Sequence, residues 1–398
     1  MTPESATRPL GAIWDALTII IFIGLLWMPT LDFFLHLDHA EAPGENRLPA
    51  KWPAFAGVGN SRDFIVGVEA YFNDHFGFRK RLVRLNNHWK GQLFHDPGSK
   101  DVLIGRDGWL YYSGERMIAH YAGAEAWSQQ DLENWRHLLE KRRDWLGARG
   151  AKYLLVLPPD KHRVYPEYLP AWLKPRGQPG KVQQLVRYMK SCSTVEILDL
   201  AQPLVDAKAI RPDYLQTDTH WNLFGGFVGY RAMIEALGRQ LPGLAPLPLD
   251  TFDWKPAPAP IGDLARMLGR PEAYPESNSV NFVALKPFVG SKVLFDPVRF
   301  PHVGNEETRT CYSVKPEASG KAMVFHDSFA CAWYPFLGQH FKEIVYVWQN
   351  EWDRALIERE KPDVVIDEML ERFFNQQDPD VLARKDGWSA VKTPVAGL

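Results

Sequence analysis

The stretch KYLLVLPP, residues 152–159, is a continuous apolar run that ends in two prolines. Such a run is typical of a strand that is buried on both faces of a sheet. Apolar segments of the same kind predict further strands at 194–198, 321–325, 343–348 and 363–367. Helical patterns alternate with these strands. The alternation predicts an α/β fold with a parallel sheet flanked by helices.

Caps and periodic apolar residues mark the helices. Ser128 and Asp131 form a capping-box pattern before an amphipathic helix that ends at Gly150. Two more helices are expected around KVQQLVRYMKS and after QTDTHW, residues 216–221. Residues 102–112, VLIGRDGWLYY, predict a hairpin with Asp-Gly in its turn.

The region 239–320 breaks this alternation because it is too rich in proline for regular structure. We expect it to be an insertion or a small β-rich lobe within the main domain. That domain is predicted to span residues 61–398, after a polar, Pro/Gly-rich linker at 36–60.

The N-terminal stretch 12–35 is strongly apolar, and its uncharged run from Ala16 to Leu31 has 16 residues. Extended past the flanking aspartates, it approaches the roughly 20 residues that span a bilayer. Arg8 precedes the run and favours a cytoplasmic N-terminus. We therefore predict a transmembrane or signal-anchor segment at 1–35. A cleaved secretory signal is the alternative, with HAEA at 39–42 as a cleavage motif.

Composition excludes some classes of function. The chain has 46 basic and 48 acidic residues and no long basic tract, so it lacks the charge pattern of a nucleic-acid-binding protein. Its 15 tryptophans fit either a large core or platforms that stack on sugar rings. The three cysteines allow one disulfide, and no Cys/His spacing indicates a zinc site. Neither a metal nor another cofactor is expected.

Polar residues that follow strands are the candidates for chemistry, because ligands of open α/β sheets bind beyond the carboxyl ends of the strands. Ser328, in HDSFA, follows a predicted strand at a turn that exposes a hydroxyl. Asp218 and His220 lie two residues apart, so in an extended segment their side chains point the same way. Alone, each also fits a cap or a turn. Together they predict a nucleophile, a base and an orienting acid for acyl transfer.

Such a reaction also needs hydrogen-bond donors for an oxyanion. The backbone N–H of Ser328 is one candidate, and the side chains of Lys161 and Asn350 are others. Lys161 fits a surface charge equally well, and Asn350 fits a turn. Trp221 is expected either to hold a sugar or to pack in the core.

Six motifs, in this order, resemble the alginate O-acetyltransferase family of the AlgJ/AlgX type. They are YFNDHFGFRKRLVRLNN (71–87), VLIGRDGWLYY (102–112), PPDKHRVYPE (158–167), TDTHWN (217–222), IGDLARML (261–268) and HDSF (326–329). The resemblance covers roughly residues 60–375. It implies an SGNH-hydrolase-like domain with permuted motif order, in which Asp-x-His precedes the serine. The short remainder after the last strand favours the AlgJ-like type, which lacks a C-terminal carbohydrate-binding module.

The resemblance implies Ser328 as nucleophile, His220 as base and Asp218 as orienter. It implies a periplasmic enzyme, anchored in the bacterial inner membrane by its N-terminal helix, that transfers acetyl groups to hydroxyls of an alginate-like exopolysaccharide. A membrane-bound O-acyltransferase partner would supply the acetyl group. Two alternatives stay open: an acetyl esterase with the same triad, and a non-catalytic polysaccharide-binding scaffold. One departure is His326, which stands where SGNH proteins often have glycine.

Overall fold

The computed structural model describes residues 8–35, 37, 50–54, 61–79, 81–82, 85, 99–175, 177–285, 288–301 and 310–388. The chain forms two compact units. One comprises Met1–Ser99 with Ala265–Ala273, and the other comprises Lys100–Leu264 with Tyr274–Leu398. The boundaries that the sequence predicts at residues 35 and 60 stay predictions. Most of the expected linker 36–60, including the motif at 39–42, lies outside the described residues.

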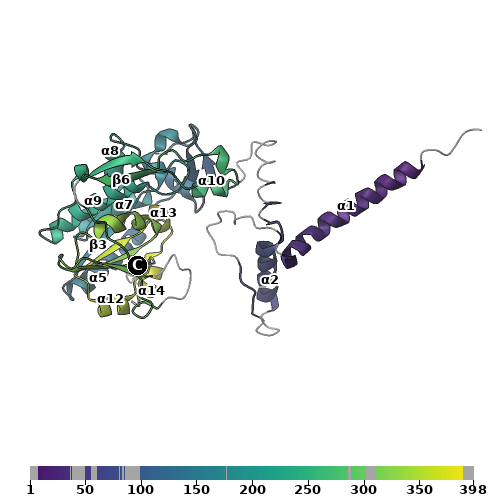
Figure 1. The fold of residues 1–398 in the computed structure, drawn as a ribbon. Coiled ribbons are helices and arrows are strands. Elements are labelled where there is room, and N and C mark those ends of the chain that lie inside the picture. Colours follow the sequence, from purple (N-terminus) through teal and green to yellow (C-terminus); the bar gives the residue numbers. More distant parts are fainter. Residues whose placement is uncertain are drawn as a thin grey trace, which may run out of the picture. The chain divides into compact units, whose positions relative to one another are not determined.

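The first unit contains the helices α1 (Arg8–Leu35) and α2 (Ser61–His75), drawn in purple and blue in Figure 1. Within α1, the window Ile13–Asp32 has 20 residues and a mean hydropathy of 1.8, and its large apolar side chains are exposed. By length and composition, this helix can cross a membrane. The apolar segment expected near the N-terminus is therefore a continuous helix.

The second unit is built on a six-stranded sheet with the order β4-β3-β10-β8-β9-β7. The strands are β3 (Lys152–Leu157), β4 (Ile197–Asp199), β7 (Cys311–Val314), β8 (Lys321–His326), β9 (Glu343–Trp348) and β10 (Val364–Glu368). Five of them are parallel and correspond to the five apolar runs. The edge strand β7 is antiparallel to β9, so the sheet is mixed rather than purely parallel. β7 comes from the region expected to be an insertion.

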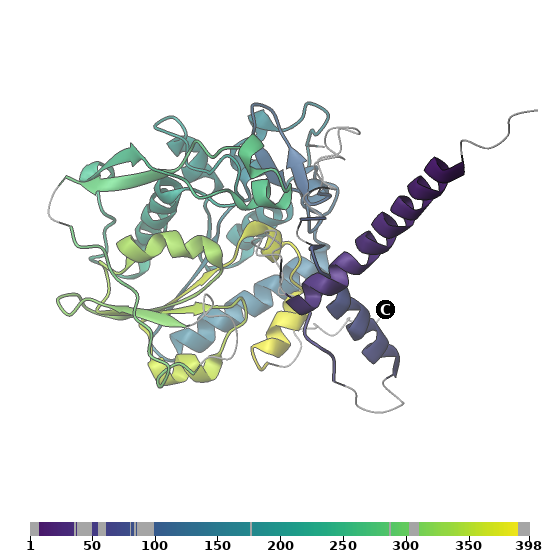
Figure 2. The ribbon, with the colours of Figure 1, turned by 45° about the vertical axis from the view of Figure 1, so that its right-hand side comes forward.

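Helices cover both faces of this sheet (Figure 2). On one face, Leu154 and Val156 of β3 pack in a core with residues of α8 (Ala201–Ala207) and α9 (Leu223–Gln240). On the other face, Tyr153 and Leu155 pack with α5 (Gln129–Gly147), α7 (Lys181–Cys192), α12 (Arg354–Glu360) and α14 (Pro379–Lys385). Successive strand residues face opposite sides, so a strand covered on both faces is apolar throughout, as the opening stretch is.

Local signals place the remaining elements. Ser128 Oγ accepts the N–H of Asp131, whose carboxylate accepts the N–H of Ser128, so the predicted capping box of α5 is confirmed. β1 (Val102–Ile104) and β2 (Leu110–Tyr112) form the predicted hairpin, and Asp107 and Gly108 have positive φ in its turn. β5 (Phe252–Pro256) and β6 (Val280–Ala284) form a second antiparallel pair, within 239–320. The shorter helices are α4 (Met117–Tyr121), α6 (Lys161–Val164), α10 (Asp263–Met267), α11 (Tyr334–Leu337) and α13 (Glu371–Phe374), with the 3₁₀ helices η2 (Pro166–Tyr168), η3 (Leu249–Thr251), η4 (Pro271–Ala273) and η6 (Ser328–Trp333).

The three cysteines are free thiols. Cys192 is exposed, Cys311 is buried and Cys331 is half-buried. The disulfide that the cysteine count would allow is therefore not present in this structure.

Candidate active site

Ser328, His220 and Asp218 form one hydrogen-bonded line. The Nδ1 atom of His220 lies 2.7 Å from Oδ1 of Asp218, and its Nε2 atom lies 2.7 Å from Oγ of Ser328. A carboxylate can only accept, so Nδ1–H donates to Asp218 and Nε2 is left as the acceptor of the Ser328 hydroxyl. The side chain of His220 is 32% exposed, so solvent reaches the ring.

The electrostatics of the pair suit a base and its orienting acid. Burial acts to lower the pKa of His220, but the hydrogen bond and charge of Asp218 outweigh it and raise the pKa above its ordinary value. Burial acts to raise the pKa of Asp218, but the hydrogen bond and charge of His220 hold that pKa at about 2. Asp218 is therefore a carboxylate at neutral pH.

The turn that carries Ser328 is held by Asp327, the residue between β8 and η6. One carboxylate oxygen of Asp327 accepts the N–H of Phe329, and the other accepts the N–H of Leu370, both at 2.9 Å. The N–H of Asp327 donates to Glu368. The backbone N–H of Ser328 donates to no group among the described residues, so it is free to meet an oxyanion.

Asn350 follows β9 at the same edge of the sheet. The register pairs His326 with Trp348, so Ser328 and Asn350 each lie two residues beyond that pair. Oδ1 of Asn350 is buried and has no hydrogen-bond partner within the described parts of the chain. Because Oδ1 only accepts, the donor to an oxyanion would be the Nδ2 group, and the register keeps Asn350 a candidate for that role.

Lys161 holds the backbone of residues 215–221, which carry His220 and are called the histidine segment below. Its ammonium donates to the backbone carbonyls of Leu215, Gln216 and Asp218 at 2.7–3.0 Å. Burial lowers the pKa of Lys161 to about 8, against the opposing charges of nearby carboxylates. An ammonium has three N–H groups, and all three are used here. The geometry therefore favours a positioning role for Lys161 over the expected contact with substrate.

Trp221 joins the histidine segment to the serine turn. Its Nε1–H donates to the carbonyl of Phe329 at 3.1 Å, and its ring packs against Phe329 and Trp333. Only 3% of Trp221 is exposed. Of the two expectations for this residue, the geometry favours core packing, because no ring face is open to a sugar.

His326, the departure from glycine, points into the protein. Its Nδ1–H donates to the carbonyl of Asp327 at 2.7 Å, and its Nε2 accepts the hydroxyl of Tyr334 at 3.1 Å. Burial lowers the pKa of His326 to about 4, so the ring is neutral at physiological pH. It fills space behind the serine turn and adds no charge there.

A residue to which sequence reasoning gave no role, Asp263, contacts the histidine segment. Its carboxylate accepts the N–H and the hydroxyl of Thr219 at 2.8 and 2.6 Å. Its own N–H donates to Oδ2 of Asp218 at 2.9 Å. The approach depends on Gly262, because a Cβ there would lie 2.2 Å from the carbonyl oxygen of Thr217. The available signal was the IGDLARML motif.

Among the residues that the structure describes, two groups of side chains have the spacing of metal ligands: Asp218, His220 and Asp263, and Asp160, His162 and Glu371. The first group brings Asp263 beside the Asp218–His220 pair, a neighbour that the sequence reasoning did not assign to His220. In the first group, both ring nitrogens of His220 already have partners.

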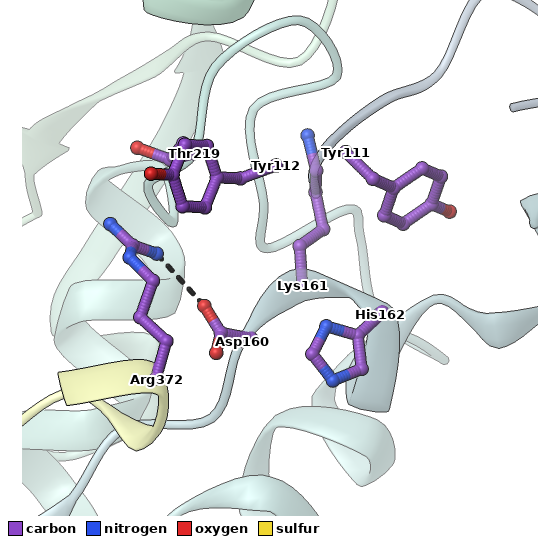
Figure 3. Close-up of a pocket in the computed structure, with 7 residues that line it drawn as sticks. All are labelled: Tyr111, Tyr112, Asp160, Lys161, His162, Thr219 and Arg372. Carbon is purple, nitrogen blue, oxygen red and sulfur yellow. Dashed lines mark hydrogen bonds and ion pairs between the residues drawn. The ribbon is translucent and has the colours of Figure 1, made fainter. Parts of the chain in front are cut away.

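In the second group, Arg372 donates to Asp160 at 2.8 Å, and Arg163 donates to Glu371 at 3.2 Å. These guanidinium groups offset the carboxylate charge that would attract a cation. Figure 3 shows this region around a cavity of about 10 Å³, the space of one water molecule, beside Thr219.

Comparison with known proteins finds a matching family and several relatives. The family described as the SGNH hydrolase-like domain of acetyltransferase AlgX matches residues 102–304, about half of the chain. A probable alginate O-acetylase AlgJ of Pseudomonas putida is 34% identical over 173 residues, which are 44% of this chain and 43% of that protein. Its counterpart from Pseudomonas fluorescens is 25% identical over 237 residues, 59% and 54% of the two chains. The chain thus spans about half of these relatives.

Among solved structures, PatB1 of Bacillus cereus superposes with a TM-score of 0.51 at 17% identity, over 70% of this chain and 98% of that one. This similarity concerns the fold alone. With the family match, it confirms the SGNH-hydrolase-like α/β fold that the six motifs implied.

Proposed function

Because this chain belongs to the family of the SGNH hydrolase-like domain of acetyltransferase AlgX, we propose that it transfers acetyl groups to hydroxyls of an exopolysaccharide. The names of the AlgJ relatives support an alginate-like polymer as the acceptor. The observation that carries the proposal is the line from Asp218 through His220 to Ser328, with 2.7 Å at both contacts. It supplies an orienter, a base and a nucleophile in hydrogen-bond reach.

The proposed reaction has two halves. In the first, Oγ of Ser328 attacks the acetyl carbonyl of the donor while Nε2 of His220 takes the hydroxyl proton. The N–H of Ser328 and the amide of Asn350 donate to the oxyanion. The tetrahedral intermediate collapses, the donor's leaving group takes the proton from His220, and acetyl-Ser328 remains.

In the second half, His220 removes a proton from a sugar hydroxyl, whose oxygen attacks the acetyl-Ser328 carbonyl. Collapse breaks the bond to Oγ, and Ser328 recovers its proton from His220. Asp218 keeps Nδ1 protonated throughout. An esterase would run the same steps with water as the acceptor, so exclusion of water decides between transfer and hydrolysis.

The base requires neutral His220, which sets the pH dependence. The pKa of His220 is raised above its ordinary value, chiefly by Asp218 against the effect of burial. Activity should therefore fall as the pH drops through a midpoint above the ordinary value of about 6.5.

The proposal extends to location and partners. The apolar helix α1 would anchor the chain in the bacterial inner membrane, with the enzymatic unit in the periplasm. A membrane-bound O-acyltransferase would then present the acetyl group, and no nucleic acid or cofactor would be needed. The expected substrate contacts of Lys161 and Trp221 become positioning and packing roles in this proposal.

The test uses the full chain in detergent with a chromogenic acetyl ester and oligouronate acceptors, beside Ser328→Ala. Mass spectrometry would follow acetyl on the sugar and on Ser328. Acetylated sugar that disappears in the variant supports transfer through Ser328. Ester cleavage without transfer to any acceptor would assign an esterase. If the wild type and Ser328→Ala show the same ester cleavage and acetyl transfer, the non-catalytic polysaccharide-binding scaffold becomes the favoured function.

A further inference from the structure

A second carboxylate lies beside the histidine of the proposed triad. Oδ2 of Asp263 is 4.0 Å from Nδ1 of His220, and the side chain of Asp263 is 21% exposed. It is the first residue of α10, more than forty residues along the chain from His220. A triad needs one acid, and Asp218 already holds Nδ1, so the presence of the second acid calls for its own explanation.

Asp263 grips the histidine segment at two points. Both of its carboxylate oxygens accept from Thr219, one from the N–H and one from the hydroxyl. Its backbone N–H holds the free oxygen of Asp218 at 2.9 Å. Asp263 therefore orients the carboxylate of Asp218 and also fixes the adjacent residue, Thr219.

Charge is the second contribution. His220 becomes an imidazolium each time it takes the Ser328 proton, and a negative charge at 4.0 Å favours that ion. The other charged groups that act on His220 are Asp218, Asp327 and the opposing Arg372. All three carboxylates accept hydrogen bonds, but those of the Asp263 side chain come from Thr219, so Asp263 adds its charge beside the imidazole without competing for Nδ1.

We propose that Asp263 is a positioning residue of this site, which holds Asp218 and Thr219 in place and stabilises the protonated form of His220. The inference rests on the proposed function, because it concerns the same site. It separates into a mechanical part, the hydrogen bonds to Thr219, and an electrostatic part, the charge. Asparagine keeps one acceptor oxygen for the N–H of Thr219, and its NH₂ group can donate to the Thr219 hydroxyl, so both contacts can persist without the negative charge.

The chain offers a matched control. Glu276 also accepts backbone N–H groups of this segment, from Gln216 and Thr217 at 2.9 and 2.7 Å, and it bonds the Thr217 hydroxyl. Its carboxylate bonds the segment at Gln216 and Thr217 rather than at Thr219, the neighbour of His220. Glu276→Gln therefore removes a carboxylate from the same loop without removing one from beside the imidazole.

The experiment measures the titration of His220 in the full chain by NMR with labelled histidine, assigned through His220→Gln. We expect Asp263→Asn to lower the midpoint by about one unit, since one nearby charge is lost. In Glu276→Gln, the titration midpoint of His220 should equal that of the wild type. In assays, Asp263→Asn should lower kcat about tenfold with little change in KM and shift the acid limb to lower pH. Asp263→Ala should lower kcat further, because the contacts to Thr219 are also lost.

Three results would overturn the inference. An unchanged midpoint in Asp263→Asn removes the electrostatic part. If Asp263→Asn and Glu276→Gln shift the titration midpoint of His220 equally, the shift is a general effect of charge in this loop. A histidine signal that moves with added Zn²⁺ in the wild type but not in Asp263→Asn would make Asp263 a metal ligand. If no variant or wild type shows Ser328-dependent activity, the proposed function fails, and the titration still decides whether Asp263 acts on His220.

Discussion

Asp367 and Glu368 are neighbours in β10, yet they serve two different polar networks on opposite faces of the sheet. Asp367 is fully buried and pairs with Arg142, and it accepts hydrogen bonds from Tyr153 and Trp352 at 3.0 and 3.2 Å. Glu368 accepts the N–H of Asp327, behind the turn that carries Ser328. Strand alternation sends adjacent side chains to opposite faces, so one strand supports both networks.

The two networks differ in what they leave open. Arg142 is 1% exposed and donates from Nε and Nη2 to Asp386 at 2.9 and 3.1 Å, so its guanidinium is enclosed by carboxylates. The side chain of His220 is 32% exposed, and its Nε2 contacts the hydroxyl of Ser328, which is half-buried. Strong pairing occurs in both. The second network also contains an accessible group that can gain a proton near neutral pH. That feature distinguishes a candidate active site from a structural ion-pair network.

The largest expected effect is that of His220→Gln. Glutamine can still donate to Asp218, but it cannot take the proton of Ser328. We expect acetyl transfer to fall by about a thousandfold or more, with the melting temperature nearly unchanged. Parallel rate and thermal-unfolding measurements check this. A variant with more than a tenth of the wild-type rate would remove the base from the proposal.

Arg142→Met should show the opposite pattern. It leaves Asp367 and Asp386 buried without their cation, which typically costs about 3–5 kcal/mol of unfolding free energy. Urea denaturation measures the loss, and the rate per folded molecule should stay at the wild-type value.

The matched control is Arg149→Met, which breaks the ion pair of Arg149 with Glu358 on the surface. Both side chains of that pair are exposed, so we expect a loss of at most about 1 kcal/mol. Equal losses in the two variants would mean that burial does not distinguish the Arg142 network.

The sequence predicts the parts of this arrangement that depend on local pattern. Apolar runs locate β3 and β8 because strands buried on both faces are apolar throughout. The sequence did not predict the strand β7, because CYSV is only four residues long and lies at the edge of the sheet, where only alternate positions are buried. The pairing of Arg142 with Asp367 joins residues 225 positions apart, and no local pattern announces it.

The site divides in the same way. Ser328, His220 and Asp218 could be selected because each lies at a strand or helix end, and the last two are close in sequence. Asp263 could not, because its contacts with Thr219 form only when the proline-rich region folds back over the loop. The positioning role of Lys161 likewise depends on three carbonyls more than fifty residues away.

A smaller effect is expected for Trp221→Phe. Phenylalanine keeps most of the packing against Phe329 and loses the hydrogen bond that joins the histidine segment to the serine turn. We expect a loss of about 0.5–1.5 kcal/mol in unfolding free energy. The rate should fall by about tenfold, because small displacements of reacting groups are costly. Unchanged kinetics with reduced stability would assign Trp221 to the core alone.

The smallest effect, and the finest test of the comparison, is Glu368→Gln. Burial first, and then the charge of Asp327, raise the pKa of Glu368 well above its ordinary value, so the folded protein holds this carboxyl neutral where the unfolded chain ionises. The wild type should therefore lose stability as the pH rises from about 4.5 towards the folded-state pKa. Glutamine has no proton to lose. The variant should match the wild type within about 1 kcal/mol at pH 5 and be relatively more stable at pH 8.

Urea denaturation at the two pH values measures the difference, and Glu360→Gln is the control of opposite sign. Burial acts to raise the pKa of Glu360, but Arg299 and Lys321 hold it at about 2. That pairing stabilises the fold above the unfolded pKa and is lost as the pH falls. Glu360→Gln should therefore be destabilising at pH 8 and less so in acid. If both glutamine variants respond to pH with the same sign, then Glu368 is ionised in the folded protein, and Asp327 has an anion rather than a neutral acid behind it.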